Sequence, residues 1–322
     1  MEHPAPYTLH PTFQQVIALK VDVDTFWGMG KGVPKLLELF RKHGVKASFF
    51  VPMGKDHTGW TVKRVFTRRG FLSKASRSGA LKTYGLRTLL YGLLLPGPHI
   101  AKGHADLLRR VVEQGHELGI HGLDHVFWHD HIKGLDRETT ESILNEAVGT
   151  YQQVLGVAPR SFGAPGWMVN QHALRFFQEN GFRYSSDVRG ENPFLPAMGG
   201  STFELVQIPT TLPTLDEVVG LEGDDNESLA DFFFRSLKGG LNVFTVHAEL
   251  EGKNWTNCLD RFLAKSLSTG FHFHRLEDVC ALLEGASRLP THEIVFGQIR
   301  GRAGEVTLQG QKIDAQEGWR RS

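Results

Sequence analysis

Short apolar runs alternate with helical patterns along most of this chain, and no other sequence feature restricts its fold so strongly. The run at 16–23, interrupted by Lys20, is typical of a strand buried on both faces of a parallel sheet. Further strands are expected at 46–52, 117–121, 160–162, 183–187, 204–208, 242–247 and 271–274. Helices are expected between them at 35–43, 104–114, 136–155, 170–181, 226–240, 257–268 and 277–284. The alternation indicates an α/β protein with a parallel sheet.

The number of alternating units favours a closed barrel over an open sheet. Strand and helix alternate about seven times within roughly 270 residues, which is typical of an α/β barrel. We therefore expect one barrel domain at 15–286, preceded by a short segment at 1–14. The segment at 287–322 lacks the pattern and is rich in Gly, Arg and Gln. It is expected to be a tail that lies on the barrel or is partly disordered.

Composition and charge exclude several classes of protein. A formal net charge of +1 argues against a general nucleic-acid-binding protein. The two cysteines, Cys258 and Cys280, form no C-x-x-C motif, which fits a reduced compartment. The N-terminal segment lacks the basic start and apolar core of a signal peptide, and no apolar run is long enough to span a membrane. We therefore expect a cytoplasmic protein without a signal peptide or a transmembrane helix.

One insertion, at 57–102, departs from this neutral composition. No Asp or Glu occurs between Asp56 and Asp106, and the stretch from Trp60 to Leu95 combines basic residues, aromatic residues and leucines. Such a segment is typical of a basic amphipathic element that binds an anionic membrane surface. The alternative is an ordinary insertion whose leucines pack on the core and whose charges are solvated. Composition alone leaves both interpretations open.

Four chemically active side chains fall at the ends of the expected strands. Asp22 and Asp24 lie two residues apart at the end of the first strand, so the strand period places both on one face. His121 and His247 end two later strands. Because the carboxyl ends of barrel strands form the active-site face, we expect these residues to meet at one rim.

The histidine spacing indicates a metal site. His121 and His125 are four residues apart, so a helical turn after the strand would direct both imidazoles to the same side. Two imidazoles and one carboxylate bind a divalent metal and leave positions open for water and substrate. Zinc, manganese or cobalt would suit this set. The spacing alone also fits unrelated histidines, and His129 continues it, but we interpret His129 and Trp128 as wall or rim residues.

The remaining groups are suited to the hydrolysis of an amide. One carboxylate of the pair can bind the metal while the other acts as general base on the metal-bound water. His247 could then protonate the departing amine. Two histidines and a carboxylate also occur in non-haem iron oxygenases. Those enzymes need oxygen and a cosubstrate, and the α/β alternation argues against their usual all-β scaffold.

These motifs resemble the polysaccharide deacetylase family, also called the NodB-homology family. The run Asp22-Val23-Asp24, the His121–His125 pair and the strand end Val246-His247 match the family motifs in order. The resemblance implies a distorted (β/α)7 barrel in which Asp22 is the base and Asp24, His121 and His125 bind the metal. It further implies His247 as general acid, with Asp187 in the run Tyr184-Ser185-Ser186-Asp187 as its partner.

The chain departs from the family pattern at one motif. The family places an arginine, which orients the base, just before a Pro-x-Gly-type turn. Here the expected position is Gly163 or Ala164, and Arg160 comes too early in the chain. Arg189 is the candidate for the missing charge.

A branch of this family, the lipid-A-modification deformylases, resembles the chain more closely. The resemblance rests on His247-Ala248-Glu249-Leu250-Glu251-Gly252 and on the run at 207–217, Gln-Ile-Pro-Thr-Thr-Leu-Pro-Thr-Leu-Asp-Glu. These enzymes remove formate from 4-deoxy-4-formamido-L-arabinose linked to undecaprenyl phosphate, a step in resistance to cationic peptides.

The closer resemblance implies a substrate and a location for this chain. The substrate would be the lipid-linked formamido sugar, reached at the cytoplasmic face of the bacterial inner membrane by peripheral binding. The stretch from Trp60 to Leu95 would then lie on the membrane surface. Substrate walls are expected at Phe26, Trp167, Thr210 and Thr211. The alternatives are an N-deacetylase of a peptidoglycan- or polysaccharide-type amino sugar and a non-catalytic module that binds lipid-linked sugars.

Overall fold

The main sheet is built around strand β1 (Val16–Asp22), and every strand pair within it is parallel. The computed structural model describes residues 13–63, 88, 90–284 and 289–313. The strand order is β10-β1-β2-β3-β4-β5-β8, with β9 also paired to β1. The bounds are β2 Ser48–Val51, β3 Glu117–Ile120, β4 Ser161–Phe162, β5 Tyr184–Ser185, β8 Val206–Gln207, β9 Leu241–His247 and β10 His272–His274.

Strand β1 is paired along both of its edges. One edge pairs with β9 over the full length from Val16 to Asp22. The other edge is shared, because β10 pairs with Val16–Ala18 and β2 with Lys20–Asp22. The carboxyl end of β1 is therefore held between β9 and β2.

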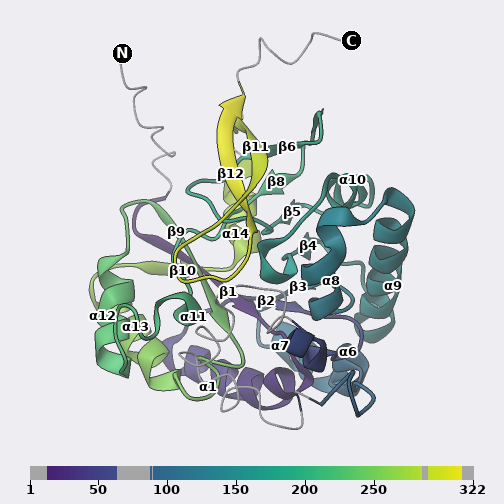
Figure 1. Ribbon diagram of the computed structural model, residues 1–322. Helices are drawn as coiled ribbons and strands as arrows, with labels where there is room; N and C mark the ends of the chain where they lie inside the picture. The colour runs from purple at the N-terminus through teal and green to yellow at the C-terminus, as the bar shows by residue number, and fades with distance from the viewer. Residues whose placement is uncertain (1–12, 64–87, 89, 285–288, 314–322) are drawn as a thin grey trace.

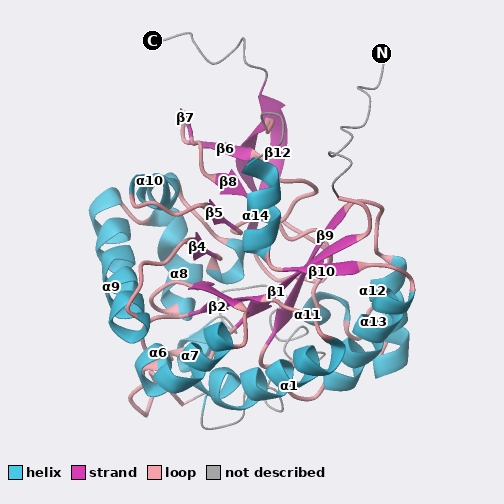
Figure 2. Ribbon diagram, turned by 180° about the vertical axis from the view of Figure 1, so that it is seen from behind, coloured by secondary structure: helices cyan, strands magenta, loops and turns pink. Residues whose placement is uncertain are grey.

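The sheet curls until its two ends approach each other. After β8, the backbone N–H groups of Thr211 and Leu212 donate to the carbonyl oxygen of Val243 in β9, at 3.1 and 3.2 Å. These bonds connect the segment after β8, the last strand in this order, to β9 and so partly close the sheet. The result is a curled, mostly parallel half-barrel surrounded by helices (Figures 1 and 2). It confirms the fold class predicted from the alternation.

Helices pack around the sheet, and those that the sequence predicts begin and end close to the expected residues, whereas three of the helices given below were not predicted. The longer ones are α1 Val33–His43, α7 Ala105–Glu113, α8 His125–His131, α9 Arg137–Leu155, α10 Gln171–Glu179, α12 Asn226–Arg235, α13 Thr256–Ser268 and α14 Leu276–Glu284. Shorter ones are α6 Ile100–Gly103 and α11 Leu215–Val218. The Asp136 side chain caps α9 by accepting from the N–H of Thr139. One boundary was wrong: the helix expected at 226–240 is α12, which is capped by Asp225 and already ends at Arg235.

Alternate residues of β1 face two different environments. Ile17, Leu19 and Val21 belong to the large cluster that includes the helix residues. Val16 and Ala18 belong to a second cluster with side chains of β2, β5, β9 and α14. By the strand period, Lys20 and Asp22 lie on this inner face, and both are buried. The inner face of β1 therefore changes from apolar to charged toward its carboxyl end.

The C-terminal segment contains regular structure that the sequence pattern did not indicate. Strands β11 (Thr291–Gly297) and β12 (Val306–Ile313) form an antiparallel hairpin, drawn in yellow in Figure 1. The hairpin joins β6 (Leu195–Met198) and β7 (Ser201–Thr202) in a second, four-stranded sheet. The segment therefore packs on the barrel, whereas the domain limits at 15 and 286 stay a prediction.

Strand β12 holds the loops that follow β4 and β5. The Thr307 hydroxyl oxygen lies 2.9 Å from the carbonyl oxygen of Trp167 and 3.0 Å from that of Asp187. The backbone N–H of Arg189 donates to the Thr307 carbonyl, and the N–H of Gln309 donates to the Arg189 carbonyl. Two loops at the carboxyl end of the sheet thus depend on a strand from the end of the chain.

Most of the basic insertion lies outside the described residues, which omit 64–87 and 89. The described parts include a short helix, η2 (Thr58–Lys63), and the exposed leucines Leu93, Leu94 and Leu95. The predicted membrane-binding stretch is therefore seen only at its two ends. Within the described ranges, no helix has the length and apolar character needed to cross a membrane.

Candidate metal centre and active site

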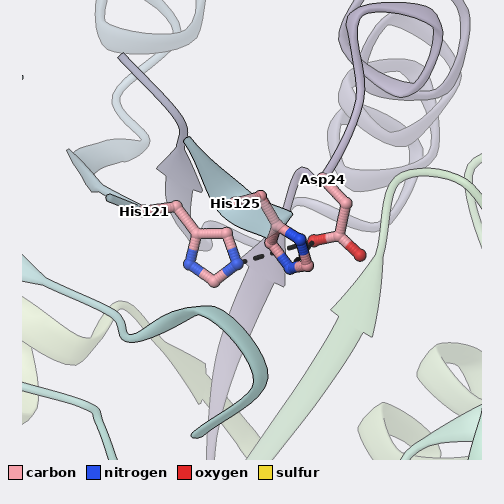
Figure 3. A group of neighbouring side chains, drawn as sticks. All are labelled: Asp24, His121 and His125. Atoms are coloured by element: carbon pink, nitrogen blue, oxygen red, sulfur yellow. Dashed lines mark ion pairs between the residues drawn. The ribbon is translucent and has the colours of Figure 1, made fainter. Parts of the chain in front are cut away.

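Asp24, His121 and His125 converge at the carboxyl end of the sheet (Figure 3). Their ligand atoms all lie within 4.8 Å of one another. The carboxylate oxygen Oδ1 of Asp24 is 3.5 Å from Nε2 of His121 and 3.3 Å from Nε2 of His125. This is the group that the sequence predicts as metal ligands, and the structure brings all three together.

Each ligand is held by the element from which it comes. Asp24 follows the end of β1, and His121 follows β3 directly. His125 is the first residue of α8, whose N-terminus is capped by Asp124 through the N–H of Phe127. The other Asp124 oxygen forms an ion pair with His57. The turn between β3 and α8 therefore fixes the direction of His125.

The donor set fits a divalent metal ion. The Nδ1 atom of His121 lies 2.6 Å from the carbonyl oxygen of Gly163, which can only accept, so Nδ1 is the donor and Nε2 is the ring nitrogen that faces the site. Two ligands each about 2.0–2.1 Å from a tetrahedral metal lie roughly 3.4 Å apart, which matches the distances of 3.3 and 3.5 Å. The buried Oδ1 of Asp24 also has no hydrogen-bond partner in the protein.

His129 does not belong to this group, as the sequence analysis expected. Its ring centroid lies 6.3 Å from that of His125. The neighbouring Trp128 is buried, and its indole N–H donates to the Met168 carbonyl at 2.7 Å. Both residues belong to α8, and neither is part of the ligand group found among the described residues.

The imidazoles favour the ionised form of Asp24. Burial alone would raise the pKa of this carboxyl group, but His125, His121 and His247 together lower it below its usual range. A carboxylate is the form that binds a metal ion.

Asp22 and His247 lie side by side at the ends of β1 and β9, where they are register partners. Asp22 is 3% exposed, and its Oδ1 atom has no hydrogen-bond partner. Its Oδ2 atom lies 3.3 Å from Nζ of Lys20. The predicted base and the predicted acid are thus neighbours, and a buried lysine that the sequence analysis did not assign accompanies the base.

Acidic neighbours favour the protonated form of His247. Burial lowers the pKa of this imidazole, but Asp24, Asp216, Glu251 and Asp22 outweigh burial and raise it. Its ring is nearly perpendicular to that of Trp167, with centroids 6.4 Å apart. A protonated imidazole in this place is suited to donate a proton.

Two buried glutamates surround the site, and the sequence analysis gave neither a role. The Oε1 atom of Glu249 accepts from the backbone N–H groups of Asp24 and Thr25 and from the Thr25 hydroxyl, at 2.8–3.0 Å. Glu251 accepts from the backbone N–H of His247 at 2.8 Å. Burial raises the pKa of Glu249 to about 8 and that of Glu251 to about 7. Both occur in the run from His247 to Gly252. The alternation of these two acids with apolar residues next to His247 was the sequence signal that could have pointed to them.

Asp187 is fully buried beside the site. Its Oδ2 atom accepts from the Gln207 amide at 2.8 Å, and Oδ1 has no partner. Burial raises the pKa of Asp187 to about 6, against the effects of Gln207, Ser185 and Lys20. Within the described residues, neither Oδ1 of Asp187 nor Nδ1 of His247 has a hydrogen-bond partner, so these two atoms do not join the pair. Its predicted role toward the acid stays a prediction.

Arg189 forms its bonds away from Asp22. Its guanidinium group donates to both carboxylate oxygens of Glu217, at 2.7 and 2.9 Å, and to the Leu212 carbonyl at 2.9 Å. It also stacks near Trp167, with Cζ 5.0 Å from the ring centroid. The cation that the structure places beside Asp22 is Lys20.

The expected substrate walls lie near the site but differ in exposure. Trp167 is 2% exposed, and its indole N–H donates to the Thr210 hydroxyl at 3.0 Å. The Thr211 hydroxyl accepts from the backbone N–H of Val243. Phe26 is partly buried and packs against His104, with ring centroids 4.2 Å apart. Trp167 has a φ of 52°, a strained conformation of the kind that clusters at functional sites.

Comparisons with known proteins identify the family. The model of the family described as "Polysaccharide deacetylase" matches residues 10–185. A probable 4-deoxy-4-formamido-L-arabinose-phosphoundecaprenol deformylase from Shewanella sediminis is 34% identical over 302 residues, covering 94% of this chain and 97% of that protein. The chain belongs to the polysaccharide deacetylase family. The predicted resemblance is therefore confirmed.

Two further comparisons extend over most of this polysaccharide deacetylase. A protein of the same description from Wigglesworthia glossinidia brevipalpis is 32% identical, covering 89% of the chain and 99% of that protein. The crystal structure of a putative polysaccharide deacetylase from Mycobacterium smegmatis superposes with a TM-score of 0.61 at 21% identity, covering 89% and 97% of the two chains. The first supports the family, and the second supports the fold. The protein is accordingly a carbon–nitrogen hydrolase that acts on an amide.

Replacing a ligand should remove the metal without unfolding the deacetylase. We expect His121→Ala to lose bound zinc, manganese or cobalt, because one imidazole and one carboxylate leave too few donors for tight binding. Metal analysis of the purified variant beside the wild type measures this. His131→Ala is the control, since His131 lies on the same helix but outside the ligand set. Equal metal content in His121→Ala and wild type would contradict the assignment.

The raised pKa of Asp187 predicts a pH-dependent stability. A buried carboxyl group whose pKa rises to about 6 stabilises the fold while protonated, and this stabilisation is lost as pH increases through 6. Asp187→Asn should therefore gain stability relative to wild type between pH 4 and pH 8, by roughly 3 kcal/mol at most. Thermal unfolding across this range measures the difference.

Asp260→Asn is the control, because the pKa of Asp260 is shifted in the direction opposite to that of Asp187. Burial raises the pKa of Asp260, but Lys42 and His43 outweigh it and lower the pKa overall. This variant should be less stable than wild type at neutral pH, and the deficit should disappear in acid. A difference for Asp187→Asn that does not vary with pH would show that the buried group does not titrate in this range.

Proposed function

We propose that this hydrolase removes formate from 4-deoxy-4-formamido-L-arabinose linked to undecaprenyl phosphate and leaves the free amino sugar lipid. The observation that carries this choice of substrate is the 34% identity to a protein of that description along 94% of the chain. The alternative, N-deacetylation of a peptidoglycan- or polysaccharide-type amino sugar, would use the same site. Removal of formate requires that the carbonyl oxygen of the amide lie next to Asp24, His121 and His125, and that the amide nitrogen lie next to His247.

In this proposal Asp24, His121 and His125 hold one divalent metal ion, either zinc, manganese or cobalt. The bound ion would polarise the formamide carbonyl and lower the pKa of a coordinated water molecule. Asp22 removes a proton from the attacking water, because its Oδ1 atom has no protein partner. His247 gives a proton to the departing sugar amine, since its acidic neighbours favour the protonated imidazole.

Asp187, Arg189 and the expected walls support these groups in the proposal. Asp187 lies in the loop after β5, and Arg189 fixes that loop through Glu217. Trp167 packs edge-on to His247 and would limit the space around the leaving amine. With Phe26, Thr210 and Thr211 it would form the sugar pocket.

The lipid substrate implies peripheral binding at the cytoplasmic face of the inner membrane. Leu94 is 79% exposed, and Leu93 and Leu95 are 44% and 39% exposed, in a segment flanked by a basic sequence. Exposed leucines beside lysines and arginines suit insertion into the acyl boundary of an anionic surface. The same location would place the sugar phosphate near the strand ends.

A formate-release assay tests the proposed reaction. The wild-type protein should release formate from the formamido-arabinose lipid faster than it releases acetate from the N-acetyl analogue. The preference should be about 10- to 200-fold at most, since one methyl group gives limited selectivity. Equal or faster release of acetate would favour the deacetylase alternative.

Asp22→Asn is the matched variant for this assay. It should lower the rate by roughly two to four orders of magnitude while the metal still binds, because only the proton acceptor is removed. A module that binds lipid-linked sugars without turnover would give no formate with either protein and would keep its cellular function in Asp22→Asn.

A vesicle assay tests the membrane interaction. The wild type should bind vesicles of phosphatidylglycerol and phosphatidylethanolamine more tightly than vesicles of phosphatidylcholine. Leu94→Glu should weaken this binding by about tenfold, because the leucine loses its place in the acyl boundary and the charge is repelled. Val157→Glu is the control, as Val157 is 60% exposed next to β4 but far in sequence from the insertion. Co-sedimentation that is unchanged by Leu94→Glu would contradict this surface.

A further inference from the structure

Lys20 is a lysine with no solvent exposure in the centre of β1. Lysine is almost never fully buried unless its charge is paired, because removal from water is costly. The residue lies on the inner face of the strand, two positions before Asp22. A charge kept at this depth directly behind the predicted base calls for a physical explanation.

The contacts of Lys20 connect the base to another strand end. Its Nζ atom donates to the carbonyl oxygen of Ser186, which follows β5, at 3.0 Å. The same atom lies 3.3 Å from Oδ2 of Asp22. It also lies 5.2 Å from the ring centroid of Phe50 and 5.8 Å from that of Trp167. Two oxygens and two aromatic faces therefore fix the ammonium group.

Gly163 leaves the space that the Lys20 side chain occupies. A Cβ atom added at Gly163 would lie 3.2 Å from Cε of Lys20 and 2.8 Å from Cγ of Phe50. Gly163 is one of the two positions at which the family pattern predicts an arginine. Because it has no side chain, the aliphatic part of Lys20 can pass close to its Cα atom. The carbonyl of the same glycine accepts from His121. The base and one metal ligand consequently depend on the same short segment.

The charge balance around Asp22 makes this pairing necessary. The buried carboxyl groups of Asp187, Glu249 and Glu251 lie at the same end of the sheet, together with the half-buried Asp24. Arg189, which was the candidate for the missing charge, donates to Glu217 instead. In the described part of the chain, the ion pair recorded for Asp22 is the one with Lys20.

We propose that Lys20 is the positioning residue of the general base. By binding Oδ2 it sets the orientation of the Asp22 carboxylate, and it leaves Oδ1 to accept the proton from the attacking water. The inference rests on the role of Asp22 in the proposed function. Lys20 acts through Asp22 in this proposal, and its polar contacts are with Asp22 and Ser186.

Substitution at Lys20 should therefore lower kcat and leave substrate binding unchanged. We expect Lys20→Met, which keeps the length of the stem, to lower kcat by about 100-fold, as a small misplacement of a reacting group can do. KM and metal content should stay within about twofold of wild type, since the ligand set is intact. Lys20→Arg should recover at least part of the lost rate, because it restores a donor to Oδ2. Lys42→Met is the control, as Lys42 is exposed and pairs with Asp260.

A double-mutant cycle separates positioning from a merely structural role. If Lys20 acts through Asp22, then Lys20→Met should cause little further loss of kcat in an Asp22→Asn background. A structural role would lower the rate by the same factor in both backgrounds, and that result would overturn the proposal. Wild-type kcat in Lys20→Met would overturn it as well.

Two further outcomes are covered by the same assay. If Lys20→Met does not fold, Lys20→Ala is purified with propylammonium, which can occupy the vacated space. Removal of the amine should lower kcat without loss of metal, and an unchanged kcat would overturn the proposal. Absence of formate release by the wild type would count against the proposed substrate, and the cycle would then be measured on the N-acetyl analogue.

Discussion

The parallel pairing of β1 with β9 is the constraint on which the rest of the structure depends. It sets Asp22 opposite His247, and the second edge of β1 is shared by β10 and β2. A shift of one residue would turn Asp22 and Lys20 from the inner face to the helix-covered face. Full-length pairing on one edge and two partners on the other exclude that shift, so the positions of the predicted acid and base follow from the sheet.

A concentration of buried acidic groups then determines the electrostatics at this end of the sheet. Asp24 is ionised because imidazoles surround it, whereas burial raises the pKa of Glu249 to about 8 and that of Asp187 to about 6. Positive charge is supplied inside the barrel by Lys20 and would be supplied at the rim by a metal ion. The acidic surroundings also raise the pKa of His247. Each cation therefore has its own carboxylate, because Lys20 pairs with Asp22 and the metal ion would bind Asp24.

The sequence predicts the positions that follow from the regular spacing of strands and helices. It does not predict the contacts that depend on where a long side chain points. Strand period and the shared rim of parallel strands were enough to predict that Asp24, His121 and His125 would meet, because they involve backbone position alone. The roles of Lys20 and Arg189 depend on where long side chains point. The sequence pointed to Arg189 for the missing charge, whereas Lys20 was only an interruption of an apolar run. The hairpin of β11 and β12 was missed because both strands are partly exposed and because β11 pairs with β6, which is distant in the sequence.

That hairpin has a consequence for how the protein is made. Thr307 holds the carbonyl groups of Trp167 and Asp187, which lie more than a hundred residues earlier in the chain. Domains generally fold from the N-terminal side during translation. The predicted metal ligands leave the ribosome well before Thr307 does, so the two loops beside them lack these contacts until Thr307 has been made. The strands that carry these residues can therefore pair in a nascent chain before the loops after β4 and β5 reach their final positions.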